Sequence, residues 1–199
     1  MTQGVNLTHT YKLTAYPKEK LLSDGAKITI RPMTTEDEAD LLDFFLRVSE
    51  EDRYFLKEEV TSPRVIKQWA QFLDYNRTLP LLAIADGKIV ADGTLHRQRG
   101  SARRHTGEIR LVVDPAFRGK GLGTVLMREL MSIARDGELE YLTTELAAEG
   151  QKEAIEVAEH LGFIRVANMT HAIKDSHNKP QDLVVLELPL GKWYDWWNF

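Results

Sequence analysis

The spacing of apolar and polar residues predicts a strand and then a helix in the middle of the chain. Ile109, Leu111 and Val113 alternate with other residues, which is the period of a half-buried strand. Val112 interrupts this alternation and indicates a β-bulge, where ladder bonding is broken and backbone groups are freed. Beyond Pro115 the apolar residues take the spacing of one helix face: Leu122, Val125, Leu126, Leu130, Ile133 and Ala134.

Similar patterns predict the remaining elements and a mixed α/β fold. Strands are expected at 27–31, 79–85, 89–97, 141–146, 163–169 and 183–188, and helices are expected to begin near residues 35, 49, 62 and 149. Asp86-Gly87 joins two of these strands as a hairpin. Two of the helices cross over between strands, so part of the sheet must be parallel.

Three segments follow from this order of elements. Residues 1–26 are interrupted by glycine and proline and are expected to form an N-terminal extension. Residues 27–189 hold the predicted strands and helices as one domain, which suits a chain of 199 residues. Residues 190–199 are a tail rich in aromatic side chains, which seldom stay in water. The tail therefore docks on its own domain, forms a contact in a homodimer, or forms a wall of a substrate site.

Composition argues against several classes of protein. The 26 basic and 30 acidic residues give a net charge of −4, which argues against a general nucleic-acid-binding protein. No apolar run approaches the ~18 residues of a membrane span, and the N-terminus carries no secretory signal pattern. The absence of cysteine excludes disulfides, thiolate metal sites and a cysteine acyl-enzyme. We therefore expect a cytoplasmic protein that holds no metal.

The turn between the central strand and its helix is rich in glycine and in basic residues. Gly119, Gly121 and Gly123 let the backbone approach a ligand, while Arg118 and Lys120 add positive charge. Because the free N–H groups at a helix start also favour an anion, this turn predicts a phosphate site. It lacks the Gly-Lys-Ser/Thr end of a mononucleotide P-loop and the G-x-G-x-x-G spacing of a dinucleotide site.

The arrangement Arg118-x-x-Gly121-x-Gly123 resembles the pyrophosphate loop of the GNAT acetyltransferase superfamily, which is patterned Arg/Gln-x-x-Gly-x-Gly/Ala. Residues 30–37 also resemble the opening of that family, and the resemblance extends over residues 24–188. It implies the GNAT fold, in which a mixed, mostly antiparallel sheet is splayed at its middle strands and flanked by helices.

The resemblance implies acetyl-CoA as the cosubstrate. It places the pantetheine arm in the splay beside Leu111, Val112 and Val113. It places the pyrophosphate on the residues of the loop, which are Arg118, Gly119, Lys120, Gly121, Leu122, Gly123 and Thr124. Many family members also bind pantetheine through an asparagine at the start of the following helix, and Gln151 takes that place here.

The chemistry implied is attack of a neutral amine on a thioester. It requires a base, because alkyl amines have a pKa near ~10.4. A carboxylate in a partly dry site suits this role, with its pKa raised toward neutrality. Glu108 matches the catalytic glutamate of the protein-lysine acetylating branches, and Glu145 on the next strand is the alternative. The tyrosine that protonates the leaving thiolate in many members is replaced by Ala158, so water, Tyr141 or His160 takes that role.

The resemblance leaves the acceptor amine open. Residues 49–55 and 158–163 resemble the bacterial Pat-like protein-lysine acetyltransferase branch, which favours a protein lysine over the alternative of a small-molecule amine. Arg53 and Tyr54 are expected to line the acceptor site. A function of a different class is a catalytically silent acyl-CoA-binding regulatory module, which the missing tyrosine permits. The basic segment 97–105 is either a solvated hairpin tip or a contact for coenzyme phosphate or an acidic substrate.

A substitution in the glycine loop tests the phosphate site. Gly121→Glu places a side chain and a negative charge where the pyrophosphate is expected, so binding of coenzyme A should be lost while the fold is kept. Titration calorimetry with coenzyme A and circular dichroism measure these two quantities. An unchanged affinity in a folded variant contradicts the assignment.

Overall fold

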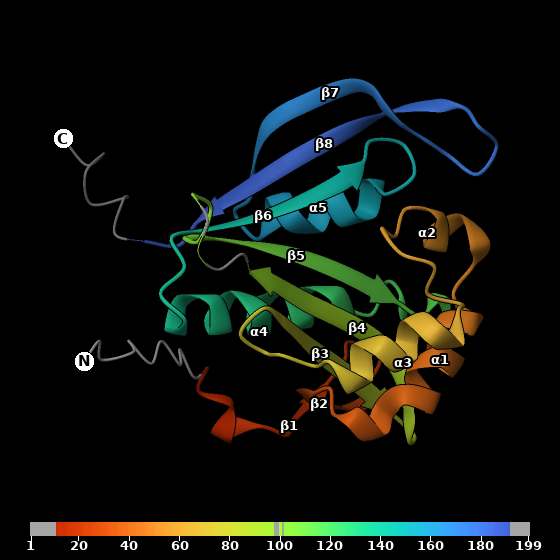
Figure 1. Ribbon diagram of the computed structural model, residues 1–199, viewed down its shortest axis with the longest axis vertical. Coiled ribbons are helices and arrows are strands. Elements are labelled where there is room, and N and C mark those ends of the chain that lie inside the picture. Colours follow the sequence, from red (N-terminus) through yellow and green to blue (C-terminus); the bar gives the residue numbers. More distant parts are fainter. Residues whose placement is uncertain (1–10, 98–99, 101, 192–199) are drawn as a thin grey trace, which may run out of the picture.

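The computed structural model describes residues 11–97, 100 and 102–191, which form one eight-stranded sheet with its helices (Figure 1). The strands are β1 (Lys18–Leu21), β2 (Lys27–Pro32), β3 (Thr78–Ala85), β4 (Lys88–Arg97), β5 (Thr106–Val113), β6 (Tyr141–Ala147), β7 (Ile164–Lys174) and β8 (Pro180–Pro189). Their order is β1-β2-β3-β4-β5-β6-β8-β7, and β5–β6 is the one parallel pair among these strands. The mixed, mostly antiparallel sheet expected from the resemblance is confirmed.

Helices cover both faces of the sheet. They are α1 (Glu38–Arg47), α2 (Glu50–Tyr54), α3 (Pro63–Gln71), α4 (Leu122–Asp136) and α5 (Lys152–His160), with 3-10 turns at Leu13–Ala15, Thr35–Asp37 and Pro115–Phe117. α1 and α3 pack on one face around a core that contains Phe44, Phe45 and Ile66. α4 and α5 pack on the other face around a larger core that contains Leu126 and Leu130. None of the helices in these ranges has both the length and the apolar character needed to cross a membrane.

The alternation predicted for the central strand sorts its side chains between these two faces. Ile109, Leu111 and Val113 pack in the core under α4, whereas Arg110 and Val112 line the space under α1 and α3. The second face therefore receives the polar side chains of the strand. It is this face that carries the candidate site.

β5 separates from β6 after a short parallel ladder. The pairing ends at Glu108 and Thr143, although both strands continue beyond these residues (Figure 1). β4 stays paired with β5 as far as Val113, without a change of register. The β-bulge predicted at Val112 is therefore wrong. The edge of β5 is left without a strand partner because β6 diverges from it, so the sheet is splayed at its middle strands.

Two features of the sheet differ from the pattern of predicted strands. Lys18–Leu21 form β1 antiparallel to β2, inside the segment expected to be an extension. β8 pairs with both β6 and β7, so the last strand lies between the two strands that precede it. Which strands pair with one another depends on contacts between segments that are distant in sequence. The local spacing of apolar residues does not specify these partners.

Glu129 on α4 joins β1 to this helix. The Tyr16 hydroxyl donates to the Glu129 carboxylate at 2.8 Å, and the ammonium groups of Lys18 and Lys20 lie 2.5 and 3.5 Å from it. Burial opposes ionisation of Glu129, but the hydrogen bonds from Lys18 and Tyr16 outweigh burial and lower its pKa. The segment before β2 is thus held against α4 by charged and polar contacts as well as by the β1–β2 ladder.

Candidate functional site

The loop between β5 and α4 presents an uncapped helix start. Gly119 and Gly121 have positive φ angles of 69° and 84°, and a Cβ atom added at either position meets no atom within 4 Å. Gly121 is the N-cap of α4. No side chain caps this helix, and its first turn carries no acidic residue. The first N–H groups of α4 lack intrahelical partners and the loop before them is open, which fits an anion such as a pyrophosphate.

Both cations of this loop are paired with carboxylates. The Arg118 guanidinium donates to the carbonyl of Val113 at 3.2 Å and to Asp52 of α2 at 2.8 Å. Lys120 lies 2.9 Å from Asp24, in the turn after β1. Burial opposes ionisation of Asp52, but its hydrogen bonds, led by that of Arg118, lower its pKa. An incoming anion must therefore share these cations with the carboxylates or displace them.

The glycine loop continues the free edge of β5. Leu111, Val112 and Val113 lie beyond the last pair with β6, and only the turn Pro115–Phe117 separates them from the loop. A molecule with its phosphates at the start of α4 can therefore extend along this edge toward Glu108. The residues of β5 predicted to hold pantetheine therefore lead directly into the loop predicted to hold the pyrophosphate.

α2 lies between the separated ends of β5 and β6 (Figure 1). It reaches the α4 side through the Asp52 carboxylate. On the other side Phe55, which follows α2, packs against Gly150 so closely that a Cβ atom there would lie 2.6 Å from the ring. Gln151 closes the same turn, because its amide oxygen accepts a bond from the backbone N–H of Ala147 at 2.9 Å. The amide oxygen of Gln151 therefore already has a partner within the fold.

Two predicted carboxylates meet at the point where the strands separate. The ammonium group of Lys57 lies 2.8 Å from Glu108 and 3.1 Å from Glu145, so it joins a carboxylate of β5 to one of β6. Arg110 donates two further bonds to Glu108, at 2.9 and 3.2 Å. Sequence reasoning missed both cations. Arg110 had a signal, since residues two apart on a strand share a face, whereas Lys57 is distant in sequence and had none.

The electrostatics of Glu108 differ from the expectation. Burial alone raises the pKa of its carboxyl, but the hydrogen bonds and charges of Arg110 and Lys57 outweigh burial and lower this pKa to about 2. The prediction that the pKa of Glu108 is raised toward neutrality is therefore wrong for this arrangement. It considered the partly dry surroundings but not the two neighbouring cations. With both cations in place, Glu108 is suited to binding a cation rather than to removing a proton at neutral pH.

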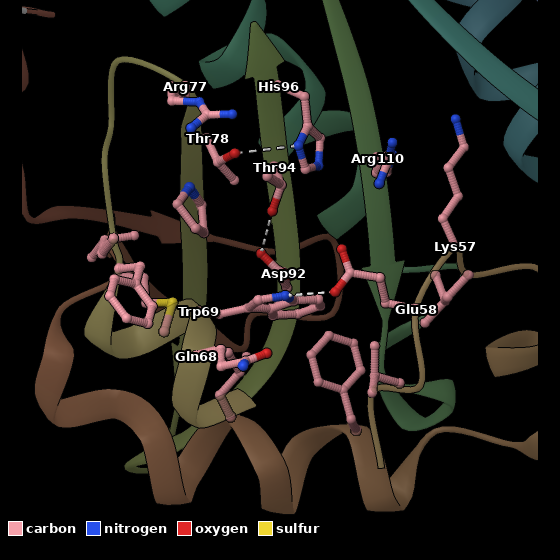
Figure 2. Close-up of a pocket in the computed structure, with 18 of the residues that line it drawn as sticks. Lys57, Glu58, Gln68, Trp69, Arg77, Thr78, Asp92, Thr94, His96 and Arg110 are labelled. Carbon is pink, nitrogen blue, oxygen red and sulfur yellow. Dashed lines mark hydrogen bonds between the residues drawn. The ribbon is translucent and has the colours of Figure 1, made fainter. Parts of the chain in front are cut away.

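A cavity of about 870 Å³ opens beside these residues, between the sheet and helices α1 and α3 (Figure 2). Its walls are largely apolar and include Met33, Leu41, Phe45, Leu56, Trp69 and Val112. The indole N–H of Trp69 donates to Glu58 at 3.0 Å on one side of the cavity. We call this cavity the chamber. Its size and its mostly apolar walls are typical of small-molecule sites.

Asp92 and His96 are the titratable residues of β4 that line the chamber. Asp92 is buried and accepts one hydrogen bond, from the Thr94 hydroxyl at 3.0 Å, and burial raises the pKa of its carboxyl to about 7. Burial and the neighbouring Arg110 lower the pKa of His96 to about 4. Near neutral pH the chamber thus holds a partly protonated carboxyl and an uncharged imidazole. Sequence reasoning missed both, although a carboxylate inside an apolar strand was a visible signal at position 92.

A smaller cavity of about 290 Å³ adjoins the chamber on the side of β6. The residues that line both cavities are Arg77, Thr78, His96 and Arg110. Glu108 and Glu145 line the smaller cavity, while Lys57 lines the chamber and contacts both of these carboxylates. Lys57 therefore stands at the junction of the two cavities.

Several residues named from the sequence lie elsewhere. Arg53 donates to the backbone carbonyl of Phe45 at 3.1 Å and so ties α2 to α1, and Tyr54 is half exposed. Neither lines either cavity, because the chain from Leu56 to Glu58 approaches the sheet instead. Tyr141 and His160, named as acids for the leaving thiolate, do not line the two cavities either.

Two predicted segments are described only in part. Residues 192–199 of the aromatic tail lie outside the described residues, as do positions 98, 99 and 101 of the basic segment. Of the remaining basic residues, Arg97 donates to the carbonyl of Gly137 at 3.1 Å, and Arg103 lines the smaller cavity.

Comparison with known proteins identifies the family of the chain. Residues 42–163, more than half of the chain, match the model of the Acetyltransferase (GNAT) family. The chain belongs to the GNAT acetyltransferase family. An acetyltransferase of Pseudomonas aeruginosa is 30% identical to it over 121 residues. This match spans 57% of the present chain and 63% of the length of that relative.

Solved structures of GNAT proteins share the fold. The GNAT domain of S. lividans PAT matches with a TM-score of 0.71 at 22% identity, over 87% of this chain and 96% of that one. A putative acetyltransferase from Salmonella typhimurium, solved with its cofactor acetyl-CoA, matches with a TM-score of 0.70 at 20% identity, over 83% of this chain and 95% of that one. Identities this low establish the shared fold alone.

The buried Asp92 should make stability depend on pH. Its folded pKa of about 7 lies above the unfolded value of ~3.9, so stability is lost as the pH rises between these values, and the loss is complete above the folded pKa. Asp92→Asn removes the charge and should raise the free energy of unfolding by about 1–3 kcal/mol at pH 8, with little change at pH 4. Urea unfolding over this range measures it, and Asp40→Asn on the exposed side of α1 is the control. Lower stability of Asp92→Asn at pH 8 contradicts this account.

Proposed function

We propose that this protein transfers the acetyl group of acetyl-CoA to the primary amine of a small molecule with an apolar body. The observation that carries the proposal is the chamber of about 870 Å³, which adjoins the carboxylates at the point where β5 and β6 separate. Cavities of this size with apolar walls and a few convergent polar groups bind small ligands. A protein acceptor requires an open groove for its backbone instead.

Acetyl-CoA suits the donor side of the proposed reaction. The uncapped start of α4 favours phosphate, and the edge of residues 111–113 offers strand backbone to the amide groups of a pantetheine arm. The Salmonella typhimurium protein of the same fold was solved with acetyl-CoA, which supports the same cosubstrate here. Laid along this edge, the acetyl end lies toward Glu108.

We assign to Glu108 and Glu145 the binding of the acceptor ammonium group. The Lys57 ammonium contacts both carboxylates, so the space between them accepts a primary ammonium. The acceptor must lose a proton before it attacks, and Glu108 is the proposed base, with Glu145 as the alternative. Departure of Lys57 removes one of the two cations that lower the pKa of Glu108 and so favours this proton transfer.

A protein lysine is the second candidate acceptor. Residues 49–55 resemble the Pat-like branch, and the GNAT domain of S. lividans PAT has the same fold. In this chain, however, that stretch has structural roles. Ser49 caps α2, Arg53 binds the end of α1, and Phe55 packs on the turn between β6 and α5. The resemblance is explained by these contacts without a protein substrate, and the chamber favours a small amine.

Release of the coenzyme A thiol with a panel of amines tests the acceptor. Small amines with aromatic or aliphatic bodies should react faster than lysine peptides. Trp69→Ala removes part of the chamber wall and should raise the KM of the best small amine by about tenfold, with the KM of acetyl-CoA little changed. Tyr54→Ala, an aromatic residue outside both cavities, is the matched control. Faster turnover of lysine peptides than of every small amine contradicts the proposal of a small-molecule acceptor.

The base has its own test. Glu108→Gln keeps the shape of the side chain and removes its charge, so kcat should fall by about 10²–10⁴-fold while the affinity for coenzyme A changes little. Glu145→Gln is the matched comparison on β6. A large loss in Glu145→Gln with none in Glu108→Gln would exchange the two roles.

A further inference from the structure

Lys57 places an internal primary amine where the acceptor amine is proposed to bind. It lies on the chain between α2 and α3, and its side chain is 47% exposed, so the amine is accessible. Figure 2 shows the extended side chain of Lys57 at the rim of the chamber, with its ammonium group directed away from Asp92. The ammonium contacts Glu108 at 2.8 Å and Glu145 at 3.1 Å.

The two carboxylates define what the Lys57 nitrogen faces. Glu108 is the last residue of β5 that pairs with β6, and Glu145 lies two residues beyond its partner Thr143. A nitrogen that bridges them therefore spans the opening between the two strands. The free edge of residues 111–113 runs from this opening to the glycine loop, so the donor's acetyl end and the Lys57 amine are directed to the same place.

We propose that Lys57 is a site of self-acetylation, at which the protein transfers an acetyl group from acetyl-CoA to its own Nζ atom. This inference rests on the proposed function, because it uses the same donor and the same carboxylates. The ammonium first gives a proton to Glu145 or to water. The nitrogen lone pair then forms the bond to the acetyl carbon as the carbon–sulfur bond breaks. The electron pair of that bond leaves on sulfur. The nitrogen gives up its second proton as it becomes an amide, and the sulfur takes up a proton to form the coenzyme A thiol.

Tethering favours Lys57 over other lysines of the chain. An amine held beside the reacting group acts at an effective concentration far above that of a free amine. Lys120 pairs with Asp24 at the phosphate end of the proposed donor site, and Lys179 pairs with Glu149 outside both cavities. Because the acetyl group stays on the protein, the reaction is a single event for each molecule rather than a turnover.

Acetylation of Lys57 changes the site for the next amine. An acetylated lysine is uncharged and cannot bridge two carboxylates, so Glu108 keeps Arg110 as its cationic partner. The space between Glu108 and Glu145 is then available to an external ammonium group, and Glu108 becomes a better base. Self-acetylation thus opens the acceptor site.

Mass spectrometry tests the modification directly. Purified protein is incubated with acetyl-CoA and no added amine, and acetyl groups are mapped by intact mass and peptide analysis. One acetyl group should appear, on Lys57, at a first-order rate that does not change on dilution. Lys57→Arg keeps a cation between the carboxylates and should take up none. Lys179→Arg, which alters a surface lysine that is also ion-paired, should label as the wild type does.

Three results overturn the inference. They are acetylation spread over many exposed lysines, a labelling rate constant that rises with protein concentration, and acetylation of Lys57 retained in a folded Gly121→Glu variant. Coenzyme A release with small amines is measured in parallel. If small amines are acetylated and Lys57 is not, self-acetylation is wrong and the proposed function stands. If Lys57 is labelled and no small amine reacts, the small-molecule acceptor is wrong. If coenzyme A binds and no amine reacts, both are wrong.

A second readout does not depend on turnover. Lys57→Gln carries an uncharged amide at this position, as acetyl-lysine does, and should raise the pKa of Glu108 measured by NMR titration. Lys57→Arg is the charge-retaining comparison and should leave that pKa low. An unchanged pKa in Lys57→Gln contradicts the opening of the site by acetylation.

Discussion

The end of the β5–β6 ladder at Glu108 and Thr143 is the constraint on which the candidate site depends. A continued ladder would use the backbone of residues 111–113 and leave no edge for a cosubstrate. Because the strands diverge, the edge leads from the glycine loop to the carboxylates, and α2 occupies the space between the strand ends. The positions of the proposed donor site, the proposed acceptor site and Lys57 between them all depend on where this pair of strands stops pairing.

The carboxyl groups of the two cavities show how neighbours, and not burial alone, decide protonation. Asp92 is buried with a single hydroxyl partner and has a raised pKa, whereas Glu108 is partly buried beside two cations and has a lowered one. Sequence reasoning identified Glu108 as a candidate but predicted the opposite shift, because Lys57 is 51 positions away along the chain. Contacts between segments that are distant in sequence set the chemistry of this site. The local spacing of residues along the chain does not predict such contacts.

The fold was more predictable than the site because more of it depends on local spacing. The period of two around Ile109 and the helical spacing from Leu122 onward predicted β5 and α4, and the glycine loop between them carried the family resemblance. Asp86-Gly87 forms the turn between β3 and β4, as predicted. The position of β8 between β6 and β7 and the formation of β1 depend on pairing across the sheet, which no local pattern specified.

The segment before β2 has a consequence for how far this protein can be shortened. β1 and its turn precede the matched region, 42–163. Yet Asp24 pairs with Lys120 of the glycine loop, and the Ser23 N–H donates to the Lys120 carbonyl at 3.2 Å. Trimming the chain to the matched region would remove both contacts with Lys120 and would leave the Glu129 carboxylate on α4 without its cations. Proteolysis between β1 and β2 would therefore disturb the glycine loop, which is remote from this segment in sequence but in direct contact with it.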